Sequence, residues 1–293
     1  MTQTMMLGLA NAGIPRDDRA IDEELLREWS ALGIRCIATG FFAPPNEVAR
    51  RASSLRGRLA DAGIAIAQYA GLNANLVHPD ARRRAVTRHQ VRDALELGRE
   101  LAVGMIASGC GTTAEAPGRS FYAPDPRNHH PETVDRLIDE LRLIAPMAED
   151  AGVMYSIECH QLTTMGDPVT IRAVLDAVDS PAIVANFDPV NLLGSVGEVY
   201  GNALAMERML DVVGPRYGPS CHVKDVVVAD ELVCRIDEAA PGEGLLDFTA
   251  FFAQAARLPG PTALIVEHLP ADRRDEAIAF VVEQAHATGA VLT

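Results

Sequence analysis

Short apolar segments alternate along the chain with longer segments whose apolar residues recur every three or four positions. The longer segments, such as 131–152, carry these residues on one face of a helix, and several end on glycine, a helix C-terminal signal. This pattern predicts eight strands, each followed by a helix. The predicted strands lie within 4–10, 34–40, 64–70, 101–108, 153–160, 182–188, 220–228 and 262–268.

Strands that are apolar on both faces and separated by helices are typical of a parallel sheet covered by helices. Eight such units in 293 residues predict an α/β fold, a single (β/α)8 TIM barrel in which 1–293 form one domain. The alternative is an open doubly wound sheet. The segment after the first predicted strand, LGLANAGIP, lacks the glycine-rich phosphate fingerprint usual in that fold.

Two connections are longer than the others, at about 109–130 and 229–247. They follow the fourth and seventh predicted strands. In a barrel both would lie at the rim formed by the carboxyl ends of the strands, where lids and substrate loops are found. We therefore expect them to be rim insertions.

The charge balance narrows the range of partners. Asp and Glu number 40 against 26 Lys and Arg, a net charge of −14, which disfavours nucleic acid and anionic membranes but not a small anionic substrate. No apolar stretch reaches the length of a membrane span. The five cysteines are scattered and form no C-x-x-C pair, and the N-terminal segment lacks the basic flank of a signal peptide. We expect a cytoplasmic protein.

The last four predicted strands each end in a group that can bind a metal ion or move a proton. These groups are Glu158, Asp188, His222 and Glu267. Successive members are one strand–helix unit apart, except that the last interval is longer by about the length of the second insertion. Because strand ends meet at one mouth of a barrel, we expect the four side chains to converge.

Three carboxylates and an imidazole are suitable ligands for a divalent ion. We favour Mn²⁺, with Co²⁺, Mg²⁺ or Zn²⁺ as alternatives. Without a dication the crowded carboxylates would repel one another, and at least one would hold a proton. Any one carboxylate alone could instead cap a turn, as Asp188 before Pro189 could. Four at equivalent strand ends favour a metal site.

The motifs IECH, NFDPVN, CHVKD, PGEG and VEH, in this order, resemble those of the sugar phosphate isomerase/epimerase superfamily, the xylose-isomerase-like barrels. The resemblance covers nearly the whole chain and is most specific from 153 to 268. It implies a Glu-Asp-His-Glu metal site made by Glu158, Asp188, His222 and Glu267. In the epimerase branch the two glutamates, Glu158 and Glu267 here, also move protons on opposite faces of the substrate carbon.

Three further side chains are predicted to bind substrate. Lys224 lies two residues after His222 and shares its face of the strand, although it could instead be a surface lysine paired with Asp225. His160 lies two residues after Glu158. Asn191 stands where many members of the epimerase branch have a substrate-binding histidine. This difference affects the ketose-epimerase assignment but not the predicted metal site. His268 is expected to turn away from the metal by alternation.

The sequence therefore predicts an enzyme, a metal-dependent sugar isomerase/epimerase that removes a proton α to a carbonyl and passes through an enediolate. The alternative is a lyase or dehydratase that expels a β-leaving group from a keto-sugar or keto-inositol on the same site. The resemblance also includes an endonuclease branch, which would need additional histidines on the second and third strands, and the predicted strands lack them. A non-catalytic barrel would not need the full ligand set. The expected partner is a small sugar or keto-polyol. Relatives often form dimers or tetramers, so a homo-oligomer stays open.

Overall fold

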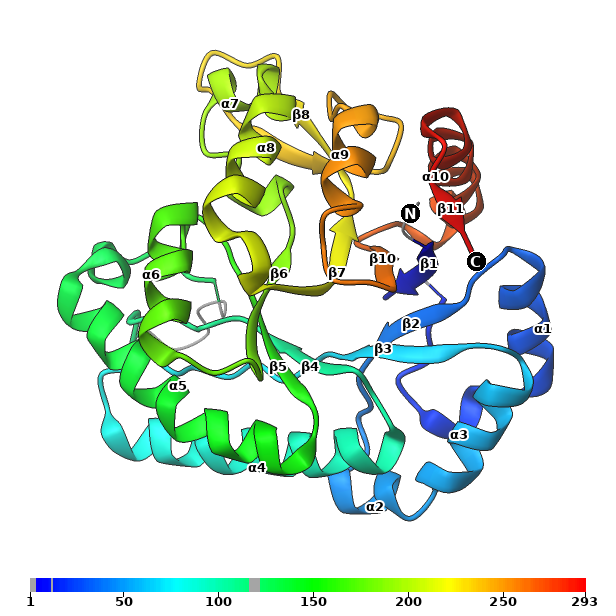
Figure 1. Cartoon of the computed structure of the whole chain (residues 1–293), viewed down its shortest axis with the longest axis horizontal. Helices are drawn as coiled ribbons and strands as arrows, with labels where there is room; N and C mark the ends of the chain where they lie inside the picture. Colours follow the sequence, from blue (N-terminus) through cyan, green and yellow to red (C-terminus); the bar gives the residue numbers. More distant parts are fainter. Residues whose placement is uncertain (1–3, 12, 116–121) are drawn as a thin grey trace.

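A closed barrel of eight parallel strands forms the centre of the molecule (Figure 1). The computed structural model describes residues 4–11, 13–115 and 122–293. The barrel strands are β1 (Thr4–Ala10), β2 (Cys36–Thr39), β3 (Ala65–Tyr69), β4 (Met105–Ser108), β5 (Met154–Glu158), β6 (Ile183–Phe187), β7 (Tyr217–Val223) and β10 (Thr262–Val266). Each pairs with the next along the chain, and β10 pairs with β1 to close the ring. Each overlaps one predicted segment, so the predicted fold is confirmed.

Helices surround the strands, as Figure 1 shows. They are α1 (Glu23–Ala31), α2 (Pro45–Ala49), α3 (Ala52–Asp61), α4 (Ala81–Leu101), α5 (Pro131–Ala151), α6 (Pro168–Val178), α7 (Val196–Tyr200), α8 (Asn202–Val213), α9 (Phe248–Ala255) and α10 (Arg274–Thr288). Helix α5 illustrates their local signals. It begins with Pro131, which needs no helical hydrogen bond there, and it is followed by Gly152, whose φ of 67° is left-handed. A two-residue strand, β11 (Val291–Leu292), adds to β1.

Small side chains make up part of the barrel interior, where Ala10, Cys36, Ala38 and Ala263 pack around Ile265. Strand register places His222 beside Ile265, Ile265 beside Gly8, and Gly8 beside Cys36, so these four residues face the same side. Gly8 has no room for a side chain there, since a Cβ would lie 2.6 Å from both the Cys36 Sγ and the Ile265 Cδ1. The larger apolar side chains pack instead between the strands and the helices. The interior is thus closed below His222.

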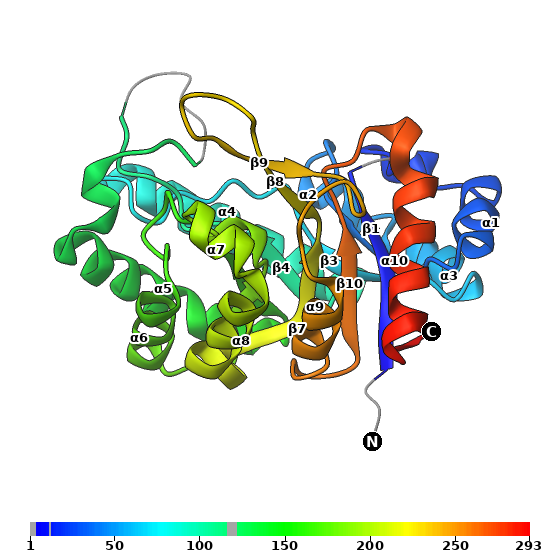
Figure 2. The ribbon, with the colours of Figure 1, turned by 90° about the horizontal axis from the view of Figure 1, so that it is seen from above.

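The seventh predicted strand is two strands. β7 ends at Val223, and β8 (Asp225–Val228) leaves the barrel to pair antiparallel with β9 (Ile236–Ala239) in a separate two-stranded sheet. The prediction of one strand over 220–228 is therefore corrected. In Figure 2 the first residues of β1 lie at the bottom and the β8–β9 hairpin at the top, so the hairpin stands at the carboxyl ends of the barrel strands.

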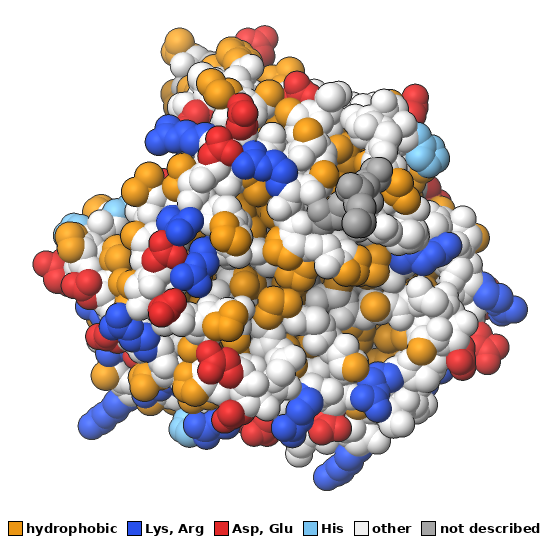
Figure 3. Space-filling view, in the orientation of Figure 1, with side chains coloured by type: hydrophobic (Ala, Val, Ile, Leu, Met, Phe, Trp, Pro, Cys, Tyr) orange, Lys and Arg blue, Asp and Glu red, His pale blue; other side chains and the backbone are white. Residues whose placement is uncertain are grey.

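The opposite face, on which the strands begin, is seen in Figure 3. Acidic and basic side chains alternate around its edge, and apolar and uncharged side chains occupy much of its centre. No helix in the described ranges is long and apolar enough to cross a membrane. Residues 116–121 of the first predicted insertion lie outside the described part of the chain. One domain over 1–293, with insertions at 109–130 and 229–247, stays a prediction.

Candidate metal centre

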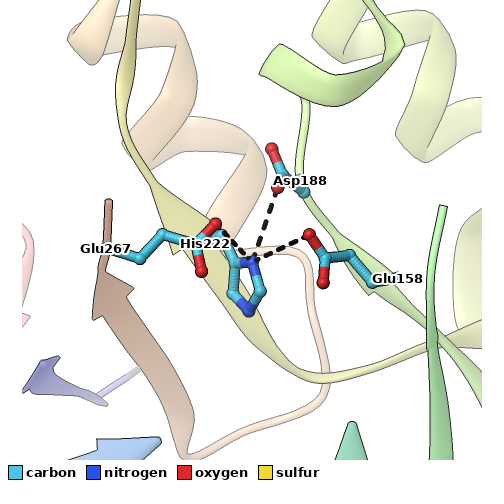
Figure 4. Close-up of side chains that lie close together, drawn as sticks. All are labelled: Glu158, Asp188, His222 and Glu267. Atoms are coloured by element: carbon cyan, nitrogen blue, oxygen red, sulfur yellow. Dashed lines mark ion pairs between the residues drawn. The ribbon is translucent and has the colours of Figure 1, made fainter. Parts of the chain in front are cut away.

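Four side chains from four barrel strands converge at the mouth (Figure 4). Glu158 is the last residue of β5, His222 lies near the end of β7, and Asp188 and Glu267 directly follow β6 and β10. One nitrogen or oxygen from each lies within 4.8 Å of the others. Asp188, His222 and Glu267 are buried and Glu158 is half-buried. The convergence expected from the sequence is therefore present.

The imidazole of His222 is at the centre of the group. Its Nδ1 lies 2.9 Å from Glu267 Oε1, 3.4 Å from Asp188 Oδ2 and 3.9 Å from Glu158 Oε1. Three of these atoms, Asp188 Oδ2, His222 Nδ1 and Glu267 Oε1, are buried, and their close contacts with described residues are ion pairs with one another and with Lys224 rather than hydrogen bonds. Three carboxylates and an imidazole are ligand types that a divalent ion accepts. Because these face one point, the four residues can hold a divalent ion.

Gln68 of β3 sets the orientation of the imidazole. Its amide nitrogen donates to Ser220 Oγ at 2.7 Å and to Asn186 Oδ1 at 3.1 Å. Its oxygen is thereby left to face His222 Nε2, 3.1 Å away, and accepts the Nε2 proton. A neutral His222 then carries its lone pair on Nδ1, toward the carboxylates, as a metal ligand requires.

The protonation of the centre depends on its own charges. Burial lowers the pKa of His222, but the carboxylates of Glu267, Asp188 and Glu158 outweigh burial and raise it well above the usual value. Burial raises the pKa of Glu158. Burial also favours neutral Glu267, but His222 and Lys224 lower the pKa of this carboxyl group. Without a metal, a proton on His222 neutralises part of the acidic cluster.

Lys224 is a second cation inside the centre. Only 1% of it is exposed, and its Nζ lies 2.9 Å from both Asp188 Oδ2 and Glu267 Oε1 and 3.0 Å from Glu238 Oε2. Burial lowers its pKa, but these carboxylates raise it well above the usual range. The alternative of a surface lysine paired with Asp225 is wrong, because the Asp225 carboxylate accepts backbone N–H groups instead.

The other two predicted substrate-binding residues lie at different distances from the cluster. Asn191 donates to Glu158 Oε1 at 3.1 Å and accepts from Lys224 Nζ at 3.1 Å, so it links a carboxylate to the buried ammonium. His160 is half-buried, and its Nδ1 accepts from the backbone N–H of Leu162. Its ring packs on Tyr122, with ring centroids 5.3 Å apart. His160 is therefore connected to the mouth of the barrel by its contact with Tyr122, which lines the cavity.

His268 does not turn away as expected. Strand β10 ends at Val266, so strict alternation no longer applies, and His268 adopts a left-handed φ of 56°. Its Nδ1 lies 3.0 Å from both carboxylate oxygens of Glu238 and 3.9 Å from Glu267 Oε1. His268 therefore joins Glu238 and Lys224 in a chain of charged contacts beside the centre.

A cavity of about 210 Å³ opens above these residues. Glu158, His222 and Glu267 line one part of it, and the remaining wall comes mainly from the ends of β1 to β4 and the loops that follow them. Small-molecule sites are typically concave and carry a few convergent polar groups, as this cavity does. The polar side chains of that wall are Asn11, Arg16, Gln68, Asn73, Ser108 and Tyr122.

Several residues of the site were not predicted from the sequence. Gln68 carried a signal, since it is the one polar side chain in the apolar segment 64–70 apart from the hydroxyl of Tyr69. Glu238 and Tyr122 lie in the two long connections, whose path over the mouth the sequence does not fix. Burial, followed by the charge of Glu158, raises the pKa of the Tyr122 hydroxyl.

A family model for the xylose isomerase-like TIM barrel matches residues 26–284 of the chain. The chain belongs to this family. The resemblance expected from the sequence motifs is thus confirmed. No curated protein sequence matches the chain.

Solved structures with the same fold cover nearly the whole chain. A D-psicose 3-epimerase crystallised with D-fructose is 15% identical, with a TM-score of 0.72 over 97% of this chain and 100% of its own. The 3-keto-D-glucoside 4-epimerase YcjR from E. coli is 17% identical, with a TM-score of 0.68 over 95% and 99%. A xylose isomerase-like TIM barrel protein from Mycobacterium smegmatis, in complex with magnesium, is 18% identical, with a TM-score of 0.69 over 99% and 98%. At these identities the likeness concerns the fold.

Proposed function

We propose that this xylose isomerase-like barrel is a divalent-metal-dependent enzyme that isomerises or epimerises a sugar or keto-polyol. The observation that carries the proposal is the convergence of Glu158, Asp188, His222 and Glu267, whose ligand atoms all lie within 4.8 Å of one another and three of which are buried. Two proteins of the same fold are sugar epimerases by name, which agrees with this reaction class.

Glu158, Asp188, His222 and Glu267 would hold the ion, and Mn²⁺ is our first candidate. When bound, a dication supplies a Lewis acid that polarises a substrate carbonyl and so acidifies the neighbouring C–H. The magnesium bound by the M. smegmatis protein agrees with an oxygen-rich site of this kind. The cytoplasmic location and the homo-oligomer stay predictions.

The proton transfers are assigned to Glu158 and Glu267, which approach the cavity from β5 and β10. One carboxylate removes the proton α to the carbonyl, and the other returns a proton to the enediolate. Asn191 donates to Glu158 and Lys224 contacts Glu267, so each carboxylate is held in position by a polar neighbour. Burial raises the pKa of Glu158, which suits a group that accepts and releases a proton.

The lyase alternative uses the same first step. It would need an acid near the departing oxygen, and Tyr122, which lines the cavity with Glu158, is our candidate for that role. The two reactions give different products from the same substrates, so one experiment separates them.

The experiment incubates ketoses and 3-keto sugars with the Mn²⁺-loaded protein in D₂O and analyses the products by mass spectrometry. Deuterium at carbon in an otherwise intact sugar is expected, and loss of water or of an aglycone would assign the lyase instead. Glu267→Gln should abolish exchange. Glu243→Gln is the matched control, because Glu243 pairs with Arg273 in a rim loop.

Circular dichroism of both variants would separate loss of activity from loss of folding. Wild-type exchange by a folded Glu267→Gln would rule out the two-glutamate mechanism. A wild-type protein that binds none of the four candidate ions would rule out the metal-dependent enzyme.

A further inference from the structure

Arg16 points into the cavity without an acidic partner. It follows β1 and lines the cavity together with Glu158, His222 and Glu267. Its guanidinium donates to neutral oxygens, from Nη1 to the Gly40 carbonyl at 3.2 Å and from Nη2 to Asn11 Oδ1 at 3.0 Å. Across the described ranges it forms no ion pair.

Several other partly buried arginines of this barrel have carboxylate partners, whereas Arg35, Arg58 and Arg136 donate to neutral oxygens as Arg16 does but do not line the cavity. Arg51 binds Asp18 through two contacts of 2.7 Å, and Arg84 and Arg88 share Glu140 at 2.8 and 2.5 Å. A guanidinium has five N–H donors, and Arg16 uses two of them on these oxygens. Donors therefore remain for a ligand.

The position of Arg16 is fixed by the ends of β1 and β2. Asn11, which accepts from its Nη2, has a left-handed φ of 61°, an uncommon conformation for a residue other than glycine. Gly40 packs so closely on β3 that a Cβ there would lie 1.7 Å from the Ala70 carbonyl oxygen. The Arg16 carbonyl accepts from Phe42 N–H at 2.9 Å. The arginine is thus held toward the cavity before any ligand arrives.

The acidic groups of the cavity do not offer Arg16 a partner, because Lys224 and His222 already lie against them. A planar guanidinium with free donors matches the two oxygens of a carboxylate or phosphate. The chain as a whole carries a net charge of −14 and repels anions, so an anionic substrate needs a local cation of this kind.

We propose that Arg16 binds an anionic group of the substrate, so that this enzyme acts on an acidic or phosphorylated keto-sugar rather than a neutral one. The inference rests on the proposed function for the reaction, but anion binding by Arg16 can be measured without turnover. The cavity is small enough for one substrate to reach from Arg16 to the carboxylate cluster.

The test titrates the Mg²⁺-loaded protein with inorganic phosphate and with glycolate by calorimetry. Arg16→Gln should weaken binding of at least one of these anions by about tenfold or more, and Arg16→Lys by less. The matched control is Arg35→Gln. Arg35 is also half-buried and donates to a backbone carbonyl, that of Ile34, but it precedes β2 at the other end of the barrel.

Equal anion binding by wild type, Arg16→Gln and Arg35→Gln would overturn the inference, as would a wild-type protein that binds neither anion. Tighter binding of phosphate assigns a phosphorylated substrate, and tighter binding of glycolate assigns a sugar acid. Metal content of all three proteins and deuterium exchange by the wild type report separately on the proposed function. A failed exchange assay with Arg16-dependent anion binding would therefore contradict the reaction and leave the anion site standing.

Discussion

The two nitrogens of His222 lie in opposite environments. Nε2 faces the amide oxygen of Gln68, and Nδ1 faces carboxylate oxygens of Glu267, Asp188 and Glu158. A histidine that only filled the barrel would not need a nitrogen that faces three carboxylates. The contact with Gln68 is the part of this arrangement that a substitution can remove without touching the candidate ligands.

Replacing Gln68 should weaken metal binding. Gln68→Leu removes the acceptor for His222 Nε2–H, and loss of such a supporting contact typically lowers metal affinity by about 10–100-fold. Calorimetric titration with Mn²⁺ measures the change. Gln161→Leu is the control, since the Gln161 amide donates to the backbone carbonyl of Leu193 instead. Unchanged affinity in a folded Gln68→Leu would contradict the role of Gln68.

Metal binding should release protons and strengthen as pH rises. The carboxylates overcome the effect of burial and raise the pKa of His222 above its usual value of about 6.5, so the metal-free protein holds a proton there that a metal must displace. That proton stabilises the metal-free fold fully below about pH 6.5, and the stabilisation is lost as pH rises through the raised pKa.

Calorimetry in two buffers of different ionisation enthalpy counts the released protons, and urea unfolding of the metal-free protein across the same pH range measures the stability. A metal affinity that does not change with pH would contradict this account of His222.

At the scale of elements, one carboxylate joins the start of the β8–β9 hairpin to the loop that follows the hairpin. Asp225 Oδ1 accepts from the N–H groups of Val226 and Leu246 at 2.8 Å, and Oδ2 from those of Gly242 and Gly244 at 3.0 and 2.9 Å. Gly244 has no room for a side chain, since a Cβ would lie 2.3 Å from Asp225 Oδ1. The hairpin carries Glu238, which contacts Lys224.

Asp225→Asn should destabilise this part of the molecule. The carboxamide has one acceptor oxygen and an NH₂ group that faces backbone donors, and a buried group left without a partner costs about 1–3 kcal/mol. Urea unfolding should show a loss of this size, and hydrogen exchange should accelerate in 236–246. Asp237→Asn is the control on the same hairpin, because Asp237 pairs with Arg235 at the surface. Equal stability of the two variants would refute the role of Asp225.

The same element shows what the sequence could not predict. Periodicity located all eight barrel strands, and β1 spans the whole segment predicted for it, because strand and helix patterns are local. The break after Val223 depends on Asp225 binding N–H groups that lie 17 to 21 residues later. The four candidate ligands were found because each ends an apolar strand. Gln68 and Arg16 were missed because their partners, Ser220 and Gly40, meet them only in the folded barrel.

At the scale of the whole molecule, the candidate ligands join four strands. Glu158, Asp188, His222 and Glu267 come from β5, β6, β7 and β10, which are neighbours in the sheet. An ion bound only by the folded protein stabilises it by about 2.7 kcal/mol at a hundred times its dissociation constant. Metal should therefore raise the melting temperature of the entire barrel rather than of one loop.

A chelator should lower the melting temperature of the metal-loaded protein, and Glu267→Gln should remove most of that difference. Scanning calorimetry with and without Mn²⁺ measures both. Glu243→Gln should keep the full metal-dependent shift. A melting temperature that does not respond to metal would contradict an ion held across these strands.

The strands also divide the cavity into two sectors. One sector, from β5 to β10, supplies three of the candidate ligands, Glu158, His222 and Glu267, whereas the other, from β1 to β4, supplies neutral side chains and Arg16. Directed evolution can exploit this division, since a library confined to Asn11, Arg16, Asn73 and Ser108 leaves every candidate ligand in place. Such a library would change which molecules bind in the cavity while the candidate ligands, and with them the reaction, stay the same. Chimeras that join β1–β4 of one barrel to β5–β10 of another would make the same change on a larger scale.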